Sequence, residues 1–240
     1  MTTLFISDLH LEANQAEIGQ QFLAFLAGEA REAEALYILG DLFEAWLGDD
    51  DPNPYYGEMK SALRELTDAG VPVYFMHGNR DFMIGDEFAA ATGITILDDP
   101  TVVDLYGDKV LLCHGDSLCT DDIQYQQVRA VVRDPNWQAM MRSKSIEERI
   151  AFAIQSRKES MERGESLSDE IMDVNQEAVA EAMTEHGVNM MLHGHTHRPA
   201  VHSLELDGQK ATRIVLGDWY EHGSVVRWDE SGPSLTTLSR

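Results

Sequence analysis

The stretch Leu4-Phe5-Ile6-Ser7-Asp8-Leu9-His10 decides how the fold is interpreted, because a short apolar run ends directly in a carboxylate and an imidazole. An apolar run of this length predicts a buried strand. The carboxyl ends of strands in an α/β sheet line the crevice where ligands bind. Four more short apolar runs are followed by side chains of metal-binding type, which are Asp41, Asn79, His114, and the pair His195 and His197. The sequence therefore predicts that five strand ends deliver seven potential ligands to one site.

Strand-like and helix-like segments alternate along the first hundred residues. We predict strands at 3–6, 36–39 and 73–76, with helices at 18–31, 55–69 and 87–91 following them. Short strands follow up to residue 113, then helical segments to 163, a helix at 170–186, and β-structure to the end of the chain. This order predicts one α/β domain, residues 1–240, built from two packed sheets with outer helices. A helical cap insertion is expected at about 121–168.

The charge of the chain excludes some classes of binding partner. The net charge of −24 repels the phosphates of nucleic acid, so we expect no nucleic-acid partner. The segment 129–163 is the exception, with eight basic and five acidic residues and a net charge of +3, which leaves −27 for the remainder. It also carries apolar residues at helical spacing. An anionic substrate would need bound cations to bind in such a background.

The predicted ligands favour particular metals and a particular reaction. Aspartate, histidine and asparagine without cysteine suit Mn²⁺, Fe²⁺ or Zn²⁺. Two such ions activate a bridging water for in-line attack on phosphorus. Each motif has an ordinary alternative when taken alone, since Gly-Asp after a strand is usually a turn and Asp-x-His is often a surface or capping pair. The order of all five together is what favours a dinuclear metal site.

The series Asp-x-His, Gly-Asp, Gly-Asn-Arg-Asp, His-Gly-Asp and Gly-His-Thr-His resembles the calcineurin-like metallophosphoesterases. Longer strings are similar to the UDP-2,3-diacylglucosamine pyrophosphohydrolases of Gram-negative lipid A biosynthesis, and they run nearly end to end. These strings are 37–46, 78–82, 114–122, 171–175 and 193–199. The resemblance implies a four-layer αββα sandwich with a helical cap insertion, and a site for two Mn²⁺ ions.

The same resemblance implies roles for individual residues. One ion would be held by Asp8, His10, Asp41 and His197, and the other by Asp41, Asn79, His114 and His195. The catalytic residues would be Asn79, Arg80 and His195, and the substrate-binding residues Asn79, Arg80, Asp122, Ser160 and His195. The reaction would be attack of water on the α-phosphorus of UDP-2,3-diacylglucosamine, giving UMP and 2,3-diacylglucosamine 1-phosphate (lipid X).

Two alternatives and one departure from the family pattern bear on the substrate contacts. Arg80 could instead pair with its neighbour Asp81. Asp122 could instead cap the helix that follows it. The chain also departs from the family pattern, because Leu167 stands where the family has a substrate-contacting lysine, and Gly164 occupies another contact position.

The diacylated substrate gives the basic cap a role. We expect the cap to hold the acyl chains and to contact the anionic inner face of the inner membrane, which would make the protein cytoplasmic and peripheral. An ordinary amphipathic lid is the alternative. The start of the chain has no secretory signal, no apolar stretch is long enough to span a membrane, and two cysteines fit a reducing cytosol. Competing functions are another dinuclear-metal phosphoesterase, acting on a nucleotide or phosphoprotein, and a metal-free scaffold on the same fold.

Overall fold

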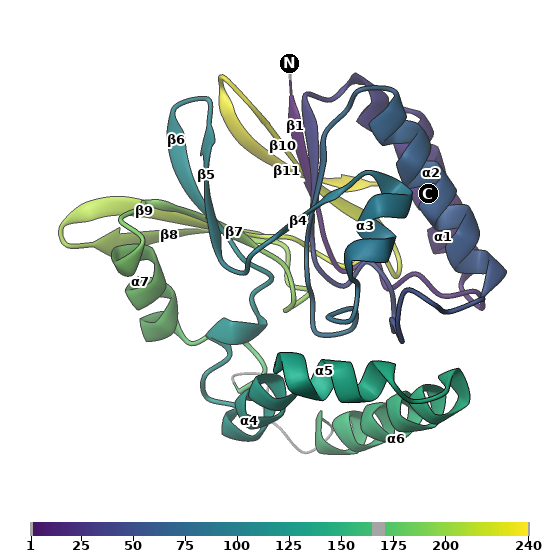
Figure 1. The fold of residues 1–240 in the computed structure, drawn as a ribbon. Coiled ribbons are helices and arrows are strands. Elements are labelled where there is room, and N and C mark those ends of the chain that lie inside the picture. Colours follow the sequence, from purple (N-terminus) through teal and green to yellow (C-terminus); the bar gives the residue numbers. More distant parts are fainter. Residues whose placement is uncertain (1, 165–170, 240) are drawn as a thin grey trace.

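Two mixed β-sheets form the centre of the computed structural model, which describes residues 2–164 and 171–239. The first sheet has six strands in the order β11 (Gly232–Leu238), β10 (Gly223–Asp229), β1 (Thr3–Ile6), β2 (Ala35–Leu39), β3 (Val73–Met76) and β4 (Thr95–Leu97). The second has five, in the order β5 (Thr101–Leu105), β6 (Asp108–Leu112), β7 (Met190–His193), β9 (Gln209–Val215) and β8 (Ala200–Leu206). Figure 1 shows the two sheets side by side.

The direction of the strands decides where the predicted ligands meet. Strands β1, β2, β3 and β4 run parallel, and so do β6, β7 and β9. The antiparallel pairs are confined to β10 and β11 in the first sheet and to the outer strands β5 and β8 in the second. The carboxyl ends of the parallel strands within each sheet therefore share one edge.

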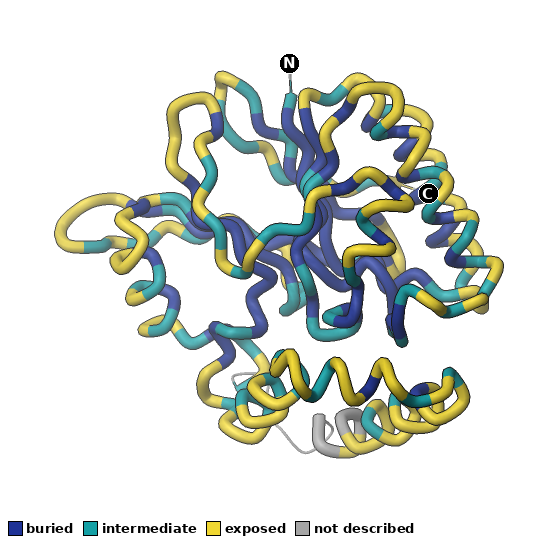
Figure 2. Tube along the Cα trace, viewed as in Figure 1, coloured by how far each residue is buried: buried dark blue, intermediate teal, exposed yellow. Residues whose placement is uncertain are grey.

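Three apolar clusters separate four layers. The first lies between the outer face of the first sheet and α1 (Ala16–Ala27), α2 (Pro54–Asp68) and α3 (Asp86–Thr92), where Phe22, Leu63 and Phe88 are buried. The second fills the space between the sheets and includes Phe5 and Trp228. The third joins the second sheet to α7 (Gln176–Glu185). Figure 2 shows the buried residues concentrated in the strands, with exposed residues on the outer helices. This arrangement confirms the predicted αββα sandwich.

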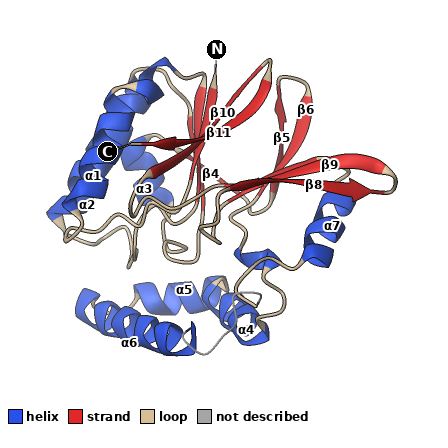
Figure 3. Ribbon diagram, turned by 180° about the vertical axis from the view of Figure 1, so that it is seen from behind, coloured by secondary structure: helices blue, strands red, loops and turns tan. Residues whose placement is uncertain are grey.

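The cap consists of three helices that follow β6 and the short 3₁₀ turn η2 (Asp116–Leu118). They are α4 (Ile123–Val132), α5 (Pro135–Arg142) and α6 (Ile146–Gly164), and they lie together beyond one end of the sandwich (Figures 1 and 3). Asp134 caps α5, whose first residue is Pro135. The further break before α6 was not predicted. There the Ser145 hydroxyl accepts from the amide of Glu148, whose carboxylate accepts from the amide of Ser145.

Some predicted boundaries are wrong. The helix expected at 170–186 begins only at Gln176, because the side chain of Asn175 accepts from the amides of Glu177 and Ala178 and caps it there. The helix expected at 18–31 ends at Ala27, and a 3₁₀ turn at Glu29–Glu32 follows. The predicted end of the cap at 168 lies outside the described residues. Of the described helices, none is long and apolar enough to cross a membrane.

Candidate metal centre

All seven predicted ligands lie in loops that leave the carboxyl ends of five parallel strands. Asp8 and His10 follow β1, Asp41 follows β2 and Asn79 follows β3. His114 follows β6, and the last pair, His195 and His197, follows β7. The first two loops continue the strand pairing, because the amides of Asp8 and His10 donate to the carbonyls of Gly40 and Asp41 at 3.1 and 3.0 Å. The backbone therefore fixes the relative positions of these loops.

Five of the seven have an unusual backbone conformation. Asp8, His10, Asp41, His195 and His197 have φ between 51° and 68°. Only two other non-glycine residues in the described part of the chain have positive φ. This conformation costs roughly 1–3 kcal/mol for each non-glycine residue and is typical of functional sites. Its concentration here indicates that the surrounding structure forces these side chains toward one point.

One group of donors gathers around Asp8. The Nε2 atoms of His10 and His197 lie 3.1 Å apart, and Oδ1 of Asp8 is 3.4 Å from Nε2 of His197. Asp8 and His10 are almost fully buried, while the side chain of His197 is 30% exposed. The three donors lie within 4.8 Å of one another, which is close enough to hold one metal ion.

A second group gathers around Asn79. Oδ1 of Asn79 lies 3.0 Å from Nε2 of His114 and 2.9 Å from Nδ1 of His195. Asp41 lies between the two groups, because its Oδ1 is 3.7 Å from Nε2 of His114 while its Oδ2 is 3.8 Å from Nε2 of His10. Asp8, Asp41 and His114 also place three donors within 4.8 Å of one another. One carboxylate thus faces both groups, as a bridging ligand must.

The donor set fits cations. Nδ1 of His114 lies 2.8 Å from the carbonyl oxygen of Leu39, so that nitrogen carries the proton in the neutral ring. In that neutral form Nε2 presents a lone pair toward the amide oxygen of Asn79, 3.0 Å away, so both atoms would be ligands for a cation between them. The Nδ1 atoms of His10 and His197 lie 3.0 and 3.4 Å from Glu44 and Asp218 carboxylate oxygens, which likewise favours lone pairs on the facing Nε2 atoms. A shared cation would satisfy both pairs of acceptors.

The electrostatics of the site favour positive charge. Burial opposes protonation of His114, but the carboxylates of Asp41, Asp8 and Asp116 outweigh it and raise its pKa to about 9. Burial, followed by the charge on His114, lowers the pKa of His195 to about 4. The pKa of Asp8 falls below its usual range although burial opposes this, because His197 and two further histidines stabilise the carboxylate. The carboxylate of Asp8 therefore remains charged and available to a metal ion.

The alternative pairing of Arg80 with Asp81 is not found. The carboxylate of Asp81 is fully buried and accepts from the amides of Leu42 and Gly78 at 2.7 and 2.8 Å. Asp81 thereby ties the loop after β2 to the loop after β3. Burial and the charge on Asp41 raise the pKa of Asp81 to about 7. Nε of Arg80 is buried and has no hydrogen-bond partner among the described residues, so this donor remains available to an anion.

The predicted sugar contacts lie on the cap. The side chain of Asp122 accepts from the amide of Tyr125 at 2.9 Å and caps α4. The alternative that Asp122 is a helix cap is therefore confirmed, and a contact with the substrate stays a prediction. Ser160 belongs to α6, but its side chain lies outside the described residues, as does Leu167.

Several residues at the site were missed by the sequence analysis. Tyr220 stacks on His10 with ring centroids 5.3 Å apart. Glu44 is 4% exposed and reaches both His10 and Arg157 of α6. Asp218, beside His197, follows Gly217 just after β9. That Gly-Asp pair repeats the pattern that singled out Asp41, so the sequence did contain a signal for it.

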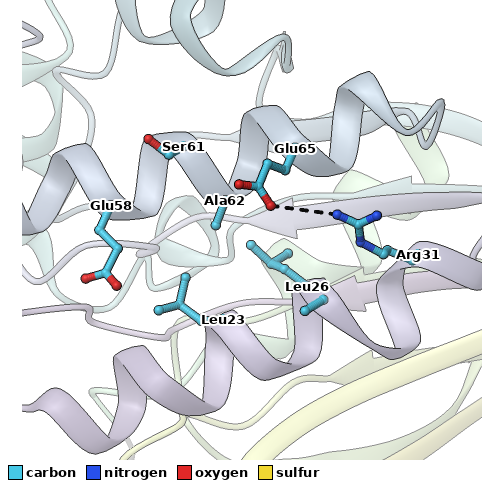
Figure 4. A pocket seen from close by; sticks show the side chains of 8 residues that line it. Leu23, Leu26, Arg31, Glu58, Ser61, Ala62 and Glu65 are labelled. Carbon is cyan, nitrogen blue, oxygen red and sulfur yellow. Dashed lines mark ion pairs between the residues drawn. The ribbon is translucent and has the colours of Figure 1, made fainter.

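A separate shallow pocket lies between α1 and α2 (Figure 4). Leu23, Leu26 and Ala62 are among its lining residues, and an exposed ion pair joins Arg31 to Glu65 at 3.7 Å. None of its lining residues belongs to the metal centre.

The fold and this centre define a phosphoesterase. The model of the family described as calcineurin-like phosphoesterase matches residues 1–199, and the chain belongs to that family. The family implies divalent metals at the centre, and the donor groups fit them.

Closer relatives carry a more specific name. Three proteins named UDP-2,3-diacylglucosamine hydrolase are similar to this chain. The one from Stenotrophomonas maltophilia (strain K279a) is 55% identical, with 100% of both chains covered. The one from Serratia proteamaculans (strain 568) is 52% identical over 95% of each chain. The one from Marinobacter nauticus (strain ATCC 700491 / DSM 11845 / VT8) is 53% identical over 100% of this chain and 97% of that protein. The resemblance inferred from the motifs is confirmed.

Proposed function

We propose that the chain hydrolyses the diphosphate of UDP-2,3-diacylglucosamine, and that water attacks the α-phosphorus to give UMP and lipid X. The observation that carries this proposal is identity above 50% along the whole chain to proteins named for that hydrolysis. The two groups of donors around Asp8 and Asn79 supply a chemical reason, because both lie at one edge of the sandwich and share Asp41.

The residues that would hold two ions form two sets, and Asp41 belongs to both. One set is Asp8, His10, Asp41 and His197, and the other is Asp41, Asn79, His114 and His195. We propose Mn²⁺, since carboxylate, imidazole and amide donors without thiolate suit it, with Fe²⁺ or Zn²⁺ as alternatives. Two bound ions lower the pKa of a water molecule and neutralise charge on phosphoryl oxygens.

The chain's own residues bind and orient the diphosphate. Arg80 is half-buried beside the centre, and its amide donates to Oδ1 of Asp41 at 2.8 Å. Its guanidinium would bind the diphosphate oxygens and stabilise the charge that develops on them. We propose that Asn79 and His195, whose side chains lie 2.9 Å apart, help to orient the same group. Asp122 and Ser160, on α4 and α6, are proposed contacts for the glucosamine end.

Hydrolysis in ¹⁸O-labelled water tests this reaction. With Mn²⁺ present, we expect cleavage of UDP-2,3-diacylglucosamine with the label in UMP, because the attacked atom is the α-phosphorus. Label in lipid X would contradict the mechanism. Cleavage of a simple nucleotide ester but not of the lipid substrate would favour another dinuclear-metal phosphoesterase. Absence of bound metal after mild purification would favour the scaffold alternative.

We also propose that the cap contacts the anionic inner face of the inner membrane and that the protein is peripheral there. The cap presents apolar side chains to solvent, with Ile123 68% and Ile154 65% exposed. Its positive charge is smaller at the surface than the sequence suggested, since four arginines bond to the body of the protein. These are Arg129, Arg133, Arg149 and Arg157. The basic side chains left for a membrane include Arg142, Lys144 and Lys158.

Vesicle flotation checks the membrane contact. Changing Arg142, Lys144 and Lys158 together to Gln is expected to weaken partitioning onto phosphatidylglycerol vesicles roughly 100-fold at low salt, because each cation near such a surface contributes about 1 kcal/mol. Lys109→Gln with Lys210→Gln is the matched control, since both lie on exposed hairpins of the second sheet. Equal flotation of the triple variant and the parent would rule out the basic contact.

A further inference from the structure

Two arginines of α4 point into the body of the protein and end beside the metal centre. Arg129 lies in the last turn of the helix and Arg133, four residues later, is its C-cap residue, and their side chains are 22% and 20% exposed. Both contact Asp116, which is fully buried and two residues after the predicted ligand His114. Burying an arginine side chain costs desolvation free energy unless hydrogen bonds and ion pairs offset that cost. The groups that these two arginines contact therefore indicate their role.

Arg129 supports the loop that carries His114. Its Nε donates to Oδ2 of Asp116 at 2.8 Å, and its Nη2 donates to Oδ2 of Asp99 at 3.2 Å. The other oxygen of Asp99 accepts from the amide of His114 itself, also at 3.2 Å. Arg129 therefore fixes both carboxylates that flank the His114 backbone.

Arg133 supports the loop that carries Asn79. Its Nη2 donates to the carbonyl of Gly78 at 2.9 Å and to that of His77 at 3.3 Å. These are the two residues immediately before Asn79 in the chain. The guanidinium thus holds the backbone from which the amide side chain of Asn79 extends.

A third residue of α4, Tyr125, completes the set. Its hydroxyl donates to Oδ2 of Asp116 at 2.7 Å, and its ring stacks against the imidazole of His195 with centroids 6.1 Å apart. The contacts of α4 thus reach the surroundings of Asn79, His114 and His195. In the part of the chain that the structure describes, none of these contacts goes to Asp8, His10 or His197.

We propose that Arg129 and Arg133 are positioning residues for one of the two ions, the one assigned to Asp41, Asn79, His114 and His195. In this proposal α4 connects the cap to the loops that carry Asn79 and His114, so the position of the cap and the geometry of that ion site depend on each other. The inference rests on the proposed two-ion function. It predicts that substituting either arginine lowers the affinity for that ion and leaves the affinity for the other ion unchanged.

Mn²⁺ binding by the intact chain tests this inference. Metal content after equilibrium dialysis and the electron paramagnetic resonance spectrum are measured for the parent, Arg129→Gln and Arg133→Gln. The parent should hold two ions with the spectrum of an exchange-coupled pair. Loss of groups that orient metal ligands typically costs 10–100-fold in affinity. Each variant should therefore bind its second ion 10–100-fold more weakly, and at intermediate Mn²⁺ it should show the six-line spectrum of a single ion.

Two further variants separate positioning from folding. Arg149→Gln removes another cap-to-body arginine, one that bonds to both oxygens of Asp50 at 2.6 and 2.8 Å and to the carbonyl of Leu47. These partners lie in the same loop as Asp41 but several residues beyond it, and within the described part of the chain none of them contacts the surroundings of Asn79, His114 or His195, so this variant should keep two ions. Arg133→Lys keeps a donor for the Gly78 carbonyl and should recover part of the lost affinity.

Wild-type affinity for both ions in Arg129→Gln and Arg133→Gln would overturn the inference, because the arginines would then hold only the cap. Equal loss of both ions would also overturn it. If the parent itself bound no Mn²⁺, the proposed function would fail first, and this inference with it.

Discussion

Asp41→Asn is expected to lower kcat about 1,000-fold without unfolding the protein. The two carboxylate oxygens face His114 on one side and His10 on the other, at 3.7 and 3.8 Å, in a side chain that is 2% exposed. The substitution removes the charge that both ions would share. A loss of about 4 kcal/mol of transition-state stabilisation corresponds to three orders of magnitude in rate.

The fold should tolerate this change for two reasons. Asparagine adopts positive φ more readily than most residues, and Asp41 has φ 51°. Its amide oxygen can still accept from the amide of Arg80, which now donates to Oδ1 of Asp41. The measurements are kcat at saturating Mn²⁺, metal content and the thermal unfolding midpoint of the metal-free protein.

Asp218→Asn gives a graded comparison for this prediction. Asp218 lies 3.4 Å from Nδ1 of His197, on the side of the ring away from the other donors. It should therefore act through His197, with a loss of only 10–100-fold in metal affinity. If Asp41→Asn lost less activity than Asp218→Asn, Asp41 would not be the bridging ligand.

The position of the ligands could be predicted because the ends of strands can be recognised in the sequence. A short apolar run followed by Asp, Asn or His indicates a strand and its carboxyl end. Once β1, β2 and β3 run parallel, the residues after them must share an edge. His114 and His195 follow parallel neighbours in the other sheet by the same rule. The convergence of the loops therefore needed no knowledge of side-chain packing.

The contacts of the cap could not be predicted in this way. Arg129 and Arg133 were counted as part of a basic face for a membrane, since composition shows only that they are cationic. Their partners Asp99 and Asp116 lie 30 and 13 residues away from Arg129 in the chain. Pairing over such a separation depends on where β5 and β6 bring the helix back to the sheets, and no local pattern encodes that.

The backbone conformation of the ligands could not be predicted from the sequence either. Asp8, His10 and Asp41 are not residues for which positive φ is the default, although Asp and His are enriched among the exceptions. The strain becomes visible only when the loops are seen paired through the bridge between Leu11 and Phe43. Sequence patterns predict which residues meet, whereas the geometry that makes them ligands is imposed by the two sheets around them.

Gly78→Ala is expected to abolish binding of at least one ion and to lower activity more than about 100-fold. A Cβ atom at Gly78 would lie 2.0 Å from Oδ1 and 2.2 Å from the backbone nitrogen of Asp41. One of these atoms is backbone, so the two loops must separate. Since Asn79 is the next residue, that separation moves one predicted ligand away from another. Overpacking of this kind costs about 1–3 kcal/mol of stability, which leaves a folded protein with a damaged centre.

Gly57→Ala is the matched control for this last prediction. Gly57 lies inside α2, and a Cβ atom there would meet nothing within 4 Å. Alanine is the better helix former, so this variant should gain about 0.5–1 kcal/mol in unfolding free energy and keep its activity. Mn²⁺ content, kcat and denaturant unfolding of both variants separate a steric effect at the centre from a general effect of an added methyl group. Full Mn²⁺ occupancy in Gly78→Ala would mean that the close approach of the β2 and β3 loops does not set the distance between Asp41 and Asn79. The two ion sites would then have to be aligned from the second sheet, through His114 and His195.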